Sequence, residues 1–146
     1  MFRGASTLSM DSKGRIAIPA KHRDALTKLV IAPNPMPDER CLLVYALDEW
    51  QVVENNIVAQ PNSPQIRRLK RVFLGEAVEY VVDGQGRVLL TPELREFAGL
   101  DKKVKLVGQG NKLEIWSEAA YQALRNMEES EEDKAAYVAT LESLSF

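Results

Sequence analysis

Short apolar runs, separated by Gly, Asp and Pro, recur along most of the chain. In some runs apolar and polar residues alternate, and in others the apolar residues are continuous over a few positions. Both patterns are typical of β-strands, with one face buried in the first case and both faces covered in the second. We expect eight strands: Ser6–Met10, Arg15–Ile18, Leu29–Ala32, Cys41–Tyr45, Glu76–Val82, Arg87–Leu90, Lys103–Val107 and Lys112–Trp116.

The segments between the strands predict short helices. Pro19 and Pro92 each follow a strand and suit the start of a helix, with Thr91 as an N-cap before the second. Longer helices are expected over three ranges: Leu47–Ala59, Gln65–Leu74 and Ser117–Met127. Near the C-terminus, an apolar stripe at helical spacing predicts a last helix packed loosely on the body. Its members are Tyr137, Leu141 and Leu144.

The pattern occurs twice. The stretch DSKGR, Asp11 to Arg15, returns 72 positions later as DGQGR, Asp83 to Arg87, and the flanking strands follow in the same order. We interpret this as a duplication with two repeats, a helical linker and a tail. The four segments cover residues 5–51 (first repeat), 52–76 (linker), 77–120 (second repeat) and 121–146 (C-terminal helical tail).

The repeated turn has a structural and a functional interpretation. In the structural one, the Asp carboxylate caps the turn, Gly takes a positive φ, and Arg begins the next strand. In the functional one, an Asp–Arg pair locks a turn that presents cations to a partner. Lys13 occurs only in the first copy, since Gln85 takes its place in the second. We therefore assign contact with a partner to the first copy and mainly a structural role to DGQGR.

Charge is distributed unevenly along the 146 residues, although the net charge is only −2. Residues 1–75 carry 11 Lys and Arg against 7 Asp and Glu, whereas residues 76–146 carry 8 against 14. The first 23 residues hold five cations and one acid, so they predict a local anion-binding face, or a solvated face without a partner. The five cations are Arg3, Lys13, Arg15, Lys21 and Arg23.

Several classes of protein are disfavoured. No apolar run approaches the roughly 20 residues that span a bilayer, and the first residues lack a secretory signal. The chain has one cysteine, Cys41, expected in the core, and one histidine, His22, expected at the surface. Neither a disulfide nor a usual zinc site can form from these, and no catalytic constellation is evident. We expect a cytoplasmic protein that is not an enzyme and has no cofactor or metal.

The motifs resemble a known family when taken together. They are MFRG, DSKGRIAIPAKHR, CLLVYALDEW, LGEA, DGQGRVLLTPELR and VGQGNKLEIW. From Met1 to about Tyr121 the chain closely resembles the MraZ family, which belongs to the SpoVT/AbrB-like, MazE-like superfamily of swapped-hairpin barrels. The resemblance implies a mainly β (α+β) fold, a pseudo-symmetric AbrB-like double-repeat barrel with linker and C-terminal helices.

The resemblance also implies a function. Members of this family form ring-shaped homo-oligomers, of octamer or dodecamer type, and bind tandem repeats in promoter DNA of the division and cell-wall gene cluster. They act mostly as repressors, with autoregulation expected. The chain would then be cytoplasmic and nucleoid-associated. An alternative is an antitoxin-like or scaffold protein whose barrel binds a protein partner.

The family motif Asp-x-x-x-Arg matches both turns of this chain. It carries a DNA-binding role to Arg15, as the main contact, and Lys13, Arg3, Lys21 and Arg23 are the further candidates. Arg can reach guanine edges with two hydrogen bonds, whereas Lys suits phosphate. The residues assigned to the structural turns are Asp11, Gly14, Asp83, Gly86 and Arg87.

Overall fold

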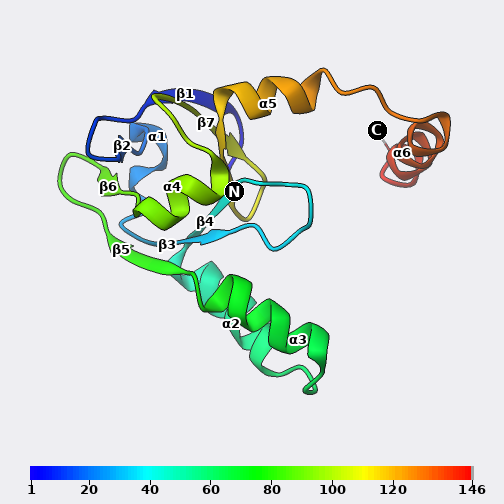
Figure 1. Ribbon diagram of the computed structural model, residues 1–146, viewed down its shortest axis with the longest axis horizontal. Coiled ribbons are helices and arrows are strands. Elements are labelled where there is room, and N and C mark those ends of the chain that lie inside the picture. Colours follow the sequence, from blue (N-terminus) through cyan, green and yellow to red (C-terminus); the bar gives the residue numbers. More distant parts are fainter. Residues whose placement is uncertain (146) are drawn as a thin grey trace.

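The computed structural model describes residues 1–145, which form an antiparallel β structure with short helices (Figure 1). Six strands make one sheet in the order β1-β7-β8-β4-β3-β5, and β2 and β6 make a separate two-stranded ribbon. The strands are β1 Ala5–Ser9, β2 Arg15–Ala17, β3 Lys28–Pro33, β4 Leu42–Ala46, β5 Val78–Val81, β6 Arg87–Leu89, β7 Lys103–Gly108 and β8 Leu113–Ser117. This confirms the predicted α+β class.

The two repeats are interleaved. Strand β1 of the first repeat pairs with β7 of the second, and β5 of the second pairs with β3 of the first. The corresponding strands β4 and β8 pair at the centre, and β2 pairs with β6. Each repeat therefore lends its first hairpin to the other, as expected of a swapped-hairpin fold.

The central strands are apolar on both faces because a core lies on each side of the sheet. In β4, Leu42 and Val44 face a core that also holds Ile16 and Val88 from the ribbon, and both are fully buried. Alternate residues of the same strand face a second core with an aromatic cluster. This second core includes Leu43 and the aromatic side chains of Tyr45, Trp50, Phe73 and Trp116. The run of apolar residues reflects a strand covered on both sides.

The longer helices begin and end within two residues of the predicted positions, although the predicted helix Gln65–Leu74 changes from an α-helix to a π-helical turn after Leu69. The helices up to Arg125 are α1 Ala20–Arg23, α2 Leu47–Val58, α3 Pro64–Leu69, a π-helical turn η1 Lys70–Leu74, α4 Pro92–Ala98 and α5 Glu118–Arg125. The Thr91 hydroxyl accepts a hydrogen bond from the Leu94 backbone N–H at 3.2 Å, which confirms the predicted N-cap. Gly99 ends α4 with a φ of +59°.

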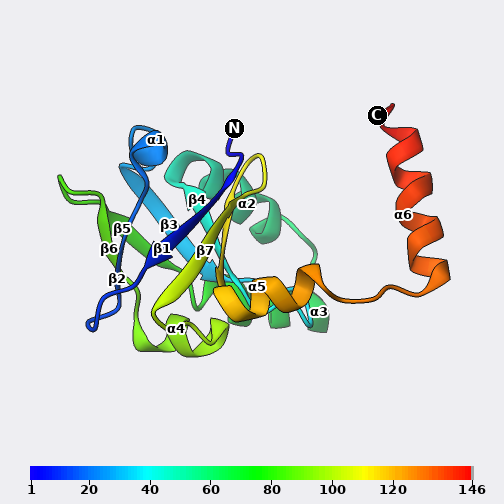
Figure 2. The ribbon, with the colours of Figure 1, turned by 90° about the horizontal axis from the view of Figure 1, so that it is seen from above.

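The predicted packing of the last helix is wrong. Helix α6, Glu131–Ser143, stands away from the sheet at the end of an extended segment (Figure 2). Every residue from Gln122 to Thr140 is exposed. Four of the five charged residues of α6 lie in its first four positions, Glu142 lies near its end, and the apolar residues lie between them. Charge and apolarity therefore separate along the axis rather than around it, so α6 has no apolar stripe that runs along its whole length.

The predicted exposure of His22 is also wrong, since only 8% of this residue is accessible. Its ring packs edge-on against Phe2, with 5.4 Å between centroids. Phe2 reaches this position because its backbone pairs with Gly110 and ties the N-terminus to the second repeat. Burial lowers the pKa of His22, so the neutral form is favoured. Cys41 is buried as predicted.

The second turn offers a test of the fold. Gly86 has a φ of +74°, and an added Cβ would overlap the Arg23 guanidinium, whereas Gly84 in the same loop has open space around it. Gly86→Ala should lower the free energy of unfolding by about 1–2 kcal/mol from the left-handed backbone alone. Gly84→Ala is the matched control and should be nearly neutral. Denaturant unfolding measures both, and equal stability of the two variants would contradict this account.

Candidate nucleic-acid interface

The first turn is built around the carboxylate of Asp11. Its Oδ1 accepts hydrogen bonds from the backbone N–H groups of Lys13 (3.0 Å) and Arg15 (2.9 Å), and its Oδ2 accepts one from Arg15 Nε at 2.7 Å. Gly14 follows with a φ of +90°, which favours glycine. One carboxylate thus shapes the loop and orients the arginine that follows it.

The second turn has the same construction. Asp83 Oδ1 accepts from the backbone N–H groups of Gln85 (2.9 Å) and Arg87 (3.0 Å), and Oδ2 accepts from Arg87 Nε at 3.2 Å. The side chains of Arg15 and Arg87 are 37% and 42% exposed. Turn geometry alone therefore does not separate a DNA-contacting copy from a structural one.

The hydrogen bonds change the acidity of both carboxyl groups. The Arg15 backbone N–H, followed by the Arg15 side chain, lowers the pKa of Asp11 from 3.8 to about 2. The Arg87 backbone N–H is the main cause that lowers the pKa of Asp83. Both aspartates are therefore ionised over the physiological range. Each holds its arginine through Nε, and within the described chain no hydrogen bond uses the terminal nitrogens of either guanidinium.

Each turn rests on an arginine from the other repeat. Arg95 crosses from α4 to Gly14, where an added Cβ would lie 2.7 Å from Arg95 Nε, and Arg23 lies against Gly86 in the same way. Arg23 Nε donates to the Ile18 carbonyl at 2.8 Å, and Arg95 Nε donates to the equivalent carbonyl of Leu90 at 3.1 Å. Each arginine side chain therefore packs against the glycine of the other repeat's turn and supports that turn.

The ribbon places the two arginines on one face. Arg15 lies opposite Leu89, and Arg87 lies opposite Ala17, whereas Ile16 and Val88 pair between them and are buried. Because side chains alternate along a strand, Arg15, Ala17, Arg87 and Leu89 share the outer face. The two arginines are offset by two residues along the ribbon, which corresponds to about 7 Å.

The five cations predicted to act together fall into separate places. Lys13 is exposed in the first turn beside Arg15, whereas Arg23 lies under the second turn. Arg3 precedes β1 and so lies at the opposite end of this strand from the DSKGR turn. Lys21 Nζ approaches Gly4 in this same N-terminal region. Sequence proximity was misleading here because the swapped strand separates neighbours along the chain.

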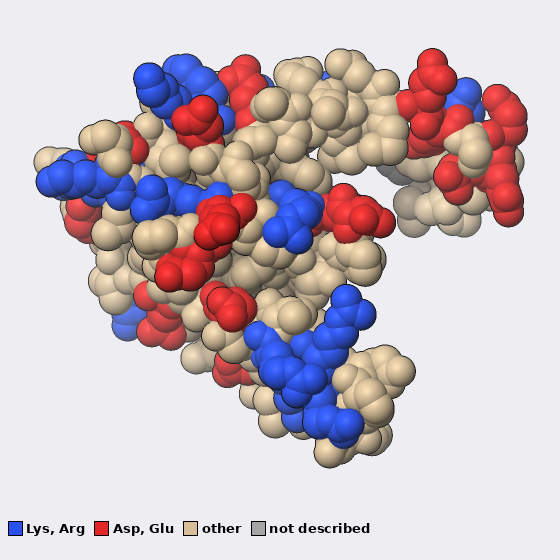
Figure 3. Space-filling view, viewed as in Figure 1, with Lys and Arg blue, Asp and Glu red and all other residues tan. Residues whose placement is uncertain are grey.

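The first turn has basic neighbours that the sequence analysis did not identify. Ser9 pairs with Lys103, whose Nζ donates to the Ser9 hydroxyl at 2.9 Å. The backbone N–H of Met10 donates to the Lys102 carbonyl at 2.7 Å, so the Lys102–Lys103 pair borders the DSKGR turn. In the sequence these two lysines stand in the motif DKK, about 90 positions after the DSKGR turn, and nothing there indicates that they lie beside it. Figure 3 shows Lys and Arg atoms gathered at the edge where the turns lie.

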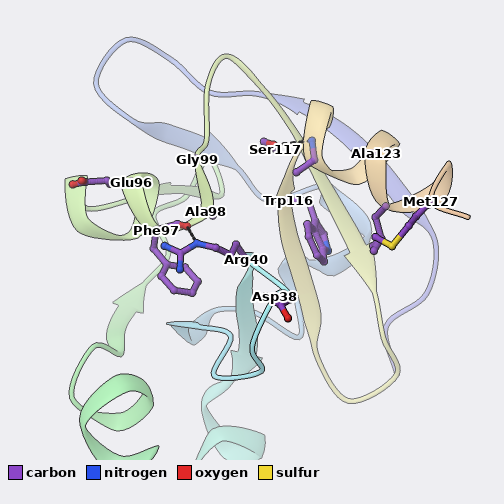
Figure 4. A pocket seen from close by; sticks show the side chains of 12 residues that line it. Asp38, Arg40, Glu96, Phe97, Ala98, Gly99, Trp116, Ser117, Ala123 and Met127 are labelled. Atoms are coloured by element: carbon purple, nitrogen blue, oxygen red, sulfur yellow. Dashed lines mark hydrogen bonds between the residues drawn. The ribbon is translucent and has the colours of Figure 1, made fainter. Parts of the chain in front are cut away.

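A hollow elsewhere on the molecule does not have the character of a catalytic site. It lies between α4, α5 and the β3–β4 loop, and Phe97, Trp116 and Met127 line it (Figure 4). The Arg40 guanidinium lies over the Phe97 ring at 4.3 Å from the centroid. Within the described lining no acid and base are hydrogen-bonded to each other.

Among the described residues no group of three or more His, Cys, Asp or Glu side chains could hold a metal ion. No helix in the same part of the chain is long and apolar enough to cross a membrane.

Comparison with known proteins shows the family to which this chain belongs. The family described as "MraZ protein, putative antitoxin-like" matches this chain twice, over residues 1–72 and 73–141. The chain belongs to the MraZ family. A transcriptional regulator MraZ from Thioalkalivibrio sulfidiphilus is 47% identical over 152 aligned positions, which cover 99% of each chain.

Two further relatives carry the same name. The protein from Halorhodospira halophila is 44% identical over 99% of each chain. The protein from Methylobacillus flagellatus is 47% identical over 84% of this chain and 85% of its own length. The MraZ family is therefore one of transcriptional regulators rather than enzymes.

The lowered pKa of Asp11 gives a direct test of the turn. A carboxyl group with a lowered pKa in the folded state stabilises the protein above its ordinary pKa of 3.8, and this contribution is lost as the pH falls towards 2. NMR titration of the side-chain carboxyl carbon should give a pKa near 2. In Arg15→Ala the pKa should rise only part of the way to 3.8, because the main cause, the backbone N–H of residue 15, remains. Titration near 3.8 in the unaltered protein would contradict the turn geometry.

Proposed function

We propose that this protein is a sequence-specific DNA-binding transcriptional regulator whose β2–β6 ribbon contacts double-stranded promoter DNA. The observation that carries the proposal is the pair of Asp-anchored arginines on the outer face of the ribbon. A two-stranded ribbon fits the major groove of B-DNA, which is about 12 Å wide. Membership of a family of transcriptional regulators supports the same conclusion.

The anchoring of Arg15 explains how one short turn could read bases. Asp11 binds Nε and leaves the terminal nitrogens for DNA, where a guanidinium can donate two hydrogen bonds to guanine. Lys13 is the candidate for phosphate, and Lys102 and Lys103 extend the same basic edge. Arg87 has the same geometry but fewer cations in its own loop, since Gln85 replaces lysine. Arg15 is thus the main contact and Arg87 a secondary one.

A single ribbon offers few contacts, so tight binding requires several. A ring-shaped homo-oligomer, of octamer or dodecamer type, would present many ribbons to tandem repeats in a promoter and gain by avidity. The proposed target is the promoter of the division and cell-wall gene cluster, with repression and autoregulation as the main effect. The protein would then act in the cytoplasm at the nucleoid.

A second candidate function is that of an antitoxin-like protein that binds a protein partner. The exposed helix α6 favours it, because such proteins present a segment that is free of their own core. The family description contains the same term. A toxin that copurifies with this protein under native conditions would support this alternative.

The role of the ribbon can be tested by substitution. Arg15→Ala should weaken binding to the DNA upstream of the protein's own gene by at least about 5-fold, since one bidentate arginine–guanine contact contributes roughly 1–3 kcal/mol. Arg87→Ala should cause a smaller loss. Arg125→Ala, at the exposed end of α5, removes the same charge and should bind normally. Gel-shift titration gives the dissociation constants, and unchanged binding of Arg15→Ala would refute the proposal.

Salt dependence tests the basic edge separately. Each neutralised phosphate releases counterions and changes the slope of log K against log salt concentration by about −0.9. Lys13→Gln gives the first turn the residue that the second turn has at the same place, Gln85. The substitution should make the slope of log K against log salt concentration less steep, by the contribution of one phosphate for each ribbon in contact with DNA. The preferred DNA sequence should not change. Fluorescence anisotropy from 50 to 200 mM salt measures this. Binding that is independent of salt would exclude phosphate contacts.

A further inference from the structure

Within residues 1–145, helix α6 buries none of its side chains against the rest of the chain. It comprises 13 residues, is capped at its start by the Ser130 hydroxyl, and has exposed apolar side chains. Tyr137 is 61% exposed, Val138 50% and Leu144 64%. An isolated helix of this length is marginally stable in water, so a partner surface is needed to hold it.

The start of α6 is strongly acidic. Between residues 128 and 133 five of six residues are carboxylates, and Lys134 makes the one ion pair described there, with Glu131 at 3.6 Å. Acidic residues at a helix N-terminus favour the helix itself through its dipole. Their number nevertheless exceeds what capping requires, and they create a negative surface clear of the body (Figure 3).

The segment α3–η1 has the opposite character. Its four cations are Arg67, Arg68, Lys70 and Arg71; no acidic residue lies between residues 55 and 75, and Glu76 and Glu93 line a hollow together with Arg71. None of the four forms an ion pair in the described part of the chain. Their apolar neighbours, such as Phe73, turn towards the aromatic core, so the charges stay on the outer side.

The two surfaces also match in size and apolar content. Helix α6 is about 20 Å long and α3–η1 about 16 Å. The basic segment also carries an exposed apolar residue, Val72 on η1, which is 41% accessible. Val72 offers apolar contact for the later half of α6, where Tyr137 and Val138 lie. The first half of α6 supplies the opposite charge.

The course of the chain favours a neighbour over the chain's own body. Helix α5 packs on β7 and β8, and the chain then leads α6 outward, across a gap from its own α3 (Figures 1 and 2). We propose that α6 of one copy docks on the basic α3–η1 surface of a second copy. This inference rests on the proposed self-association and is independent of DNA binding.

Charge reversal in separate chains can test this contact without DNA. Variant one carries Arg68→Glu and Arg71→Glu, and variant two carries Glu131→Lys and Glu132→Lys. Each alone should lose the hydrogen-exchange protection of the α6 amides that the unaltered protein shows, by about 10-fold or more. Coexpression of the two variants should restore part of it, because each acidic helix then meets a basic surface on the other chain.

Controls distinguish the outcomes. Asp24→Lys with Glu79→Lys reverses two exposed charges elsewhere and should leave the protection of α6 intact. If coexpression does not restore the hydrogen-exchange protection of α6, the helix docks on its own chain. If the α6 amides of the unaltered protein are not protected, the helix does not dock at all. Either result overturns the proposal. If α6 is unprotected and variant one loses DNA affinity, the basic surface binds DNA instead. Failure of the DNA proposal alone would leave these exchange results unchanged.

Discussion

The fold depends on the contact that each repeat makes beneath the turn of the other. Arg95 lies against Gly14 and Arg23 against Gly86, each hydrogen-bonded to the carbonyl that precedes its own helix. The glycines permit this close approach because they lack a Cβ, and their positive φ closes the turns. Neither half of the chain can complete its own hairpin. The two-stranded ribbon therefore exists only when both repeats are folded together.

This interlocking explains the arrangement of charge at the candidate interface. Because β1 pairs with β7, lysines of the second repeat border the first turn, and α1 of the first repeat supports the second turn. Asp11 and Asp83 then orient the exposed arginines through Nε and keep the terminal nitrogens available. A rigid turn costs less ordering entropy on binding than a mobile one, so the same hydrogen bonds that stabilise the loop also prepare it for a ligand.

Charge outside the ribbon has a different distribution. The C-terminal helix concentrates acid away from the body, and the linker helix concentrates base on the outside of the aromatic core. Among the described residues no ion pair joins the acidic C-terminal helix to the basic linker helix. Oppositely charged surfaces on identical chains favour association of copies and set their orientation. Assembly and DNA binding would then use separate parts of the molecule.

The sequence alone determined the strands, most helices, the duplication and the Asp–Gly–Arg turns, because these depend on local periodicity, capping and backbone sterics. It also indicated that Lys13 and Arg15 lie together in the first turn, because they are two positions apart in the chain. The tertiary structure decided which distant residues meet: Lys102 and Lys103 beside the first turn, Arg3 far from it, and His22 buried against Phe2. Strand exchange between the repeats sets these contacts, and no local pattern encodes which repeat supplies the partner strand. The exposed position of α6 was equally out of reach, since helical spacing shows a stripe but not the surface that covers it.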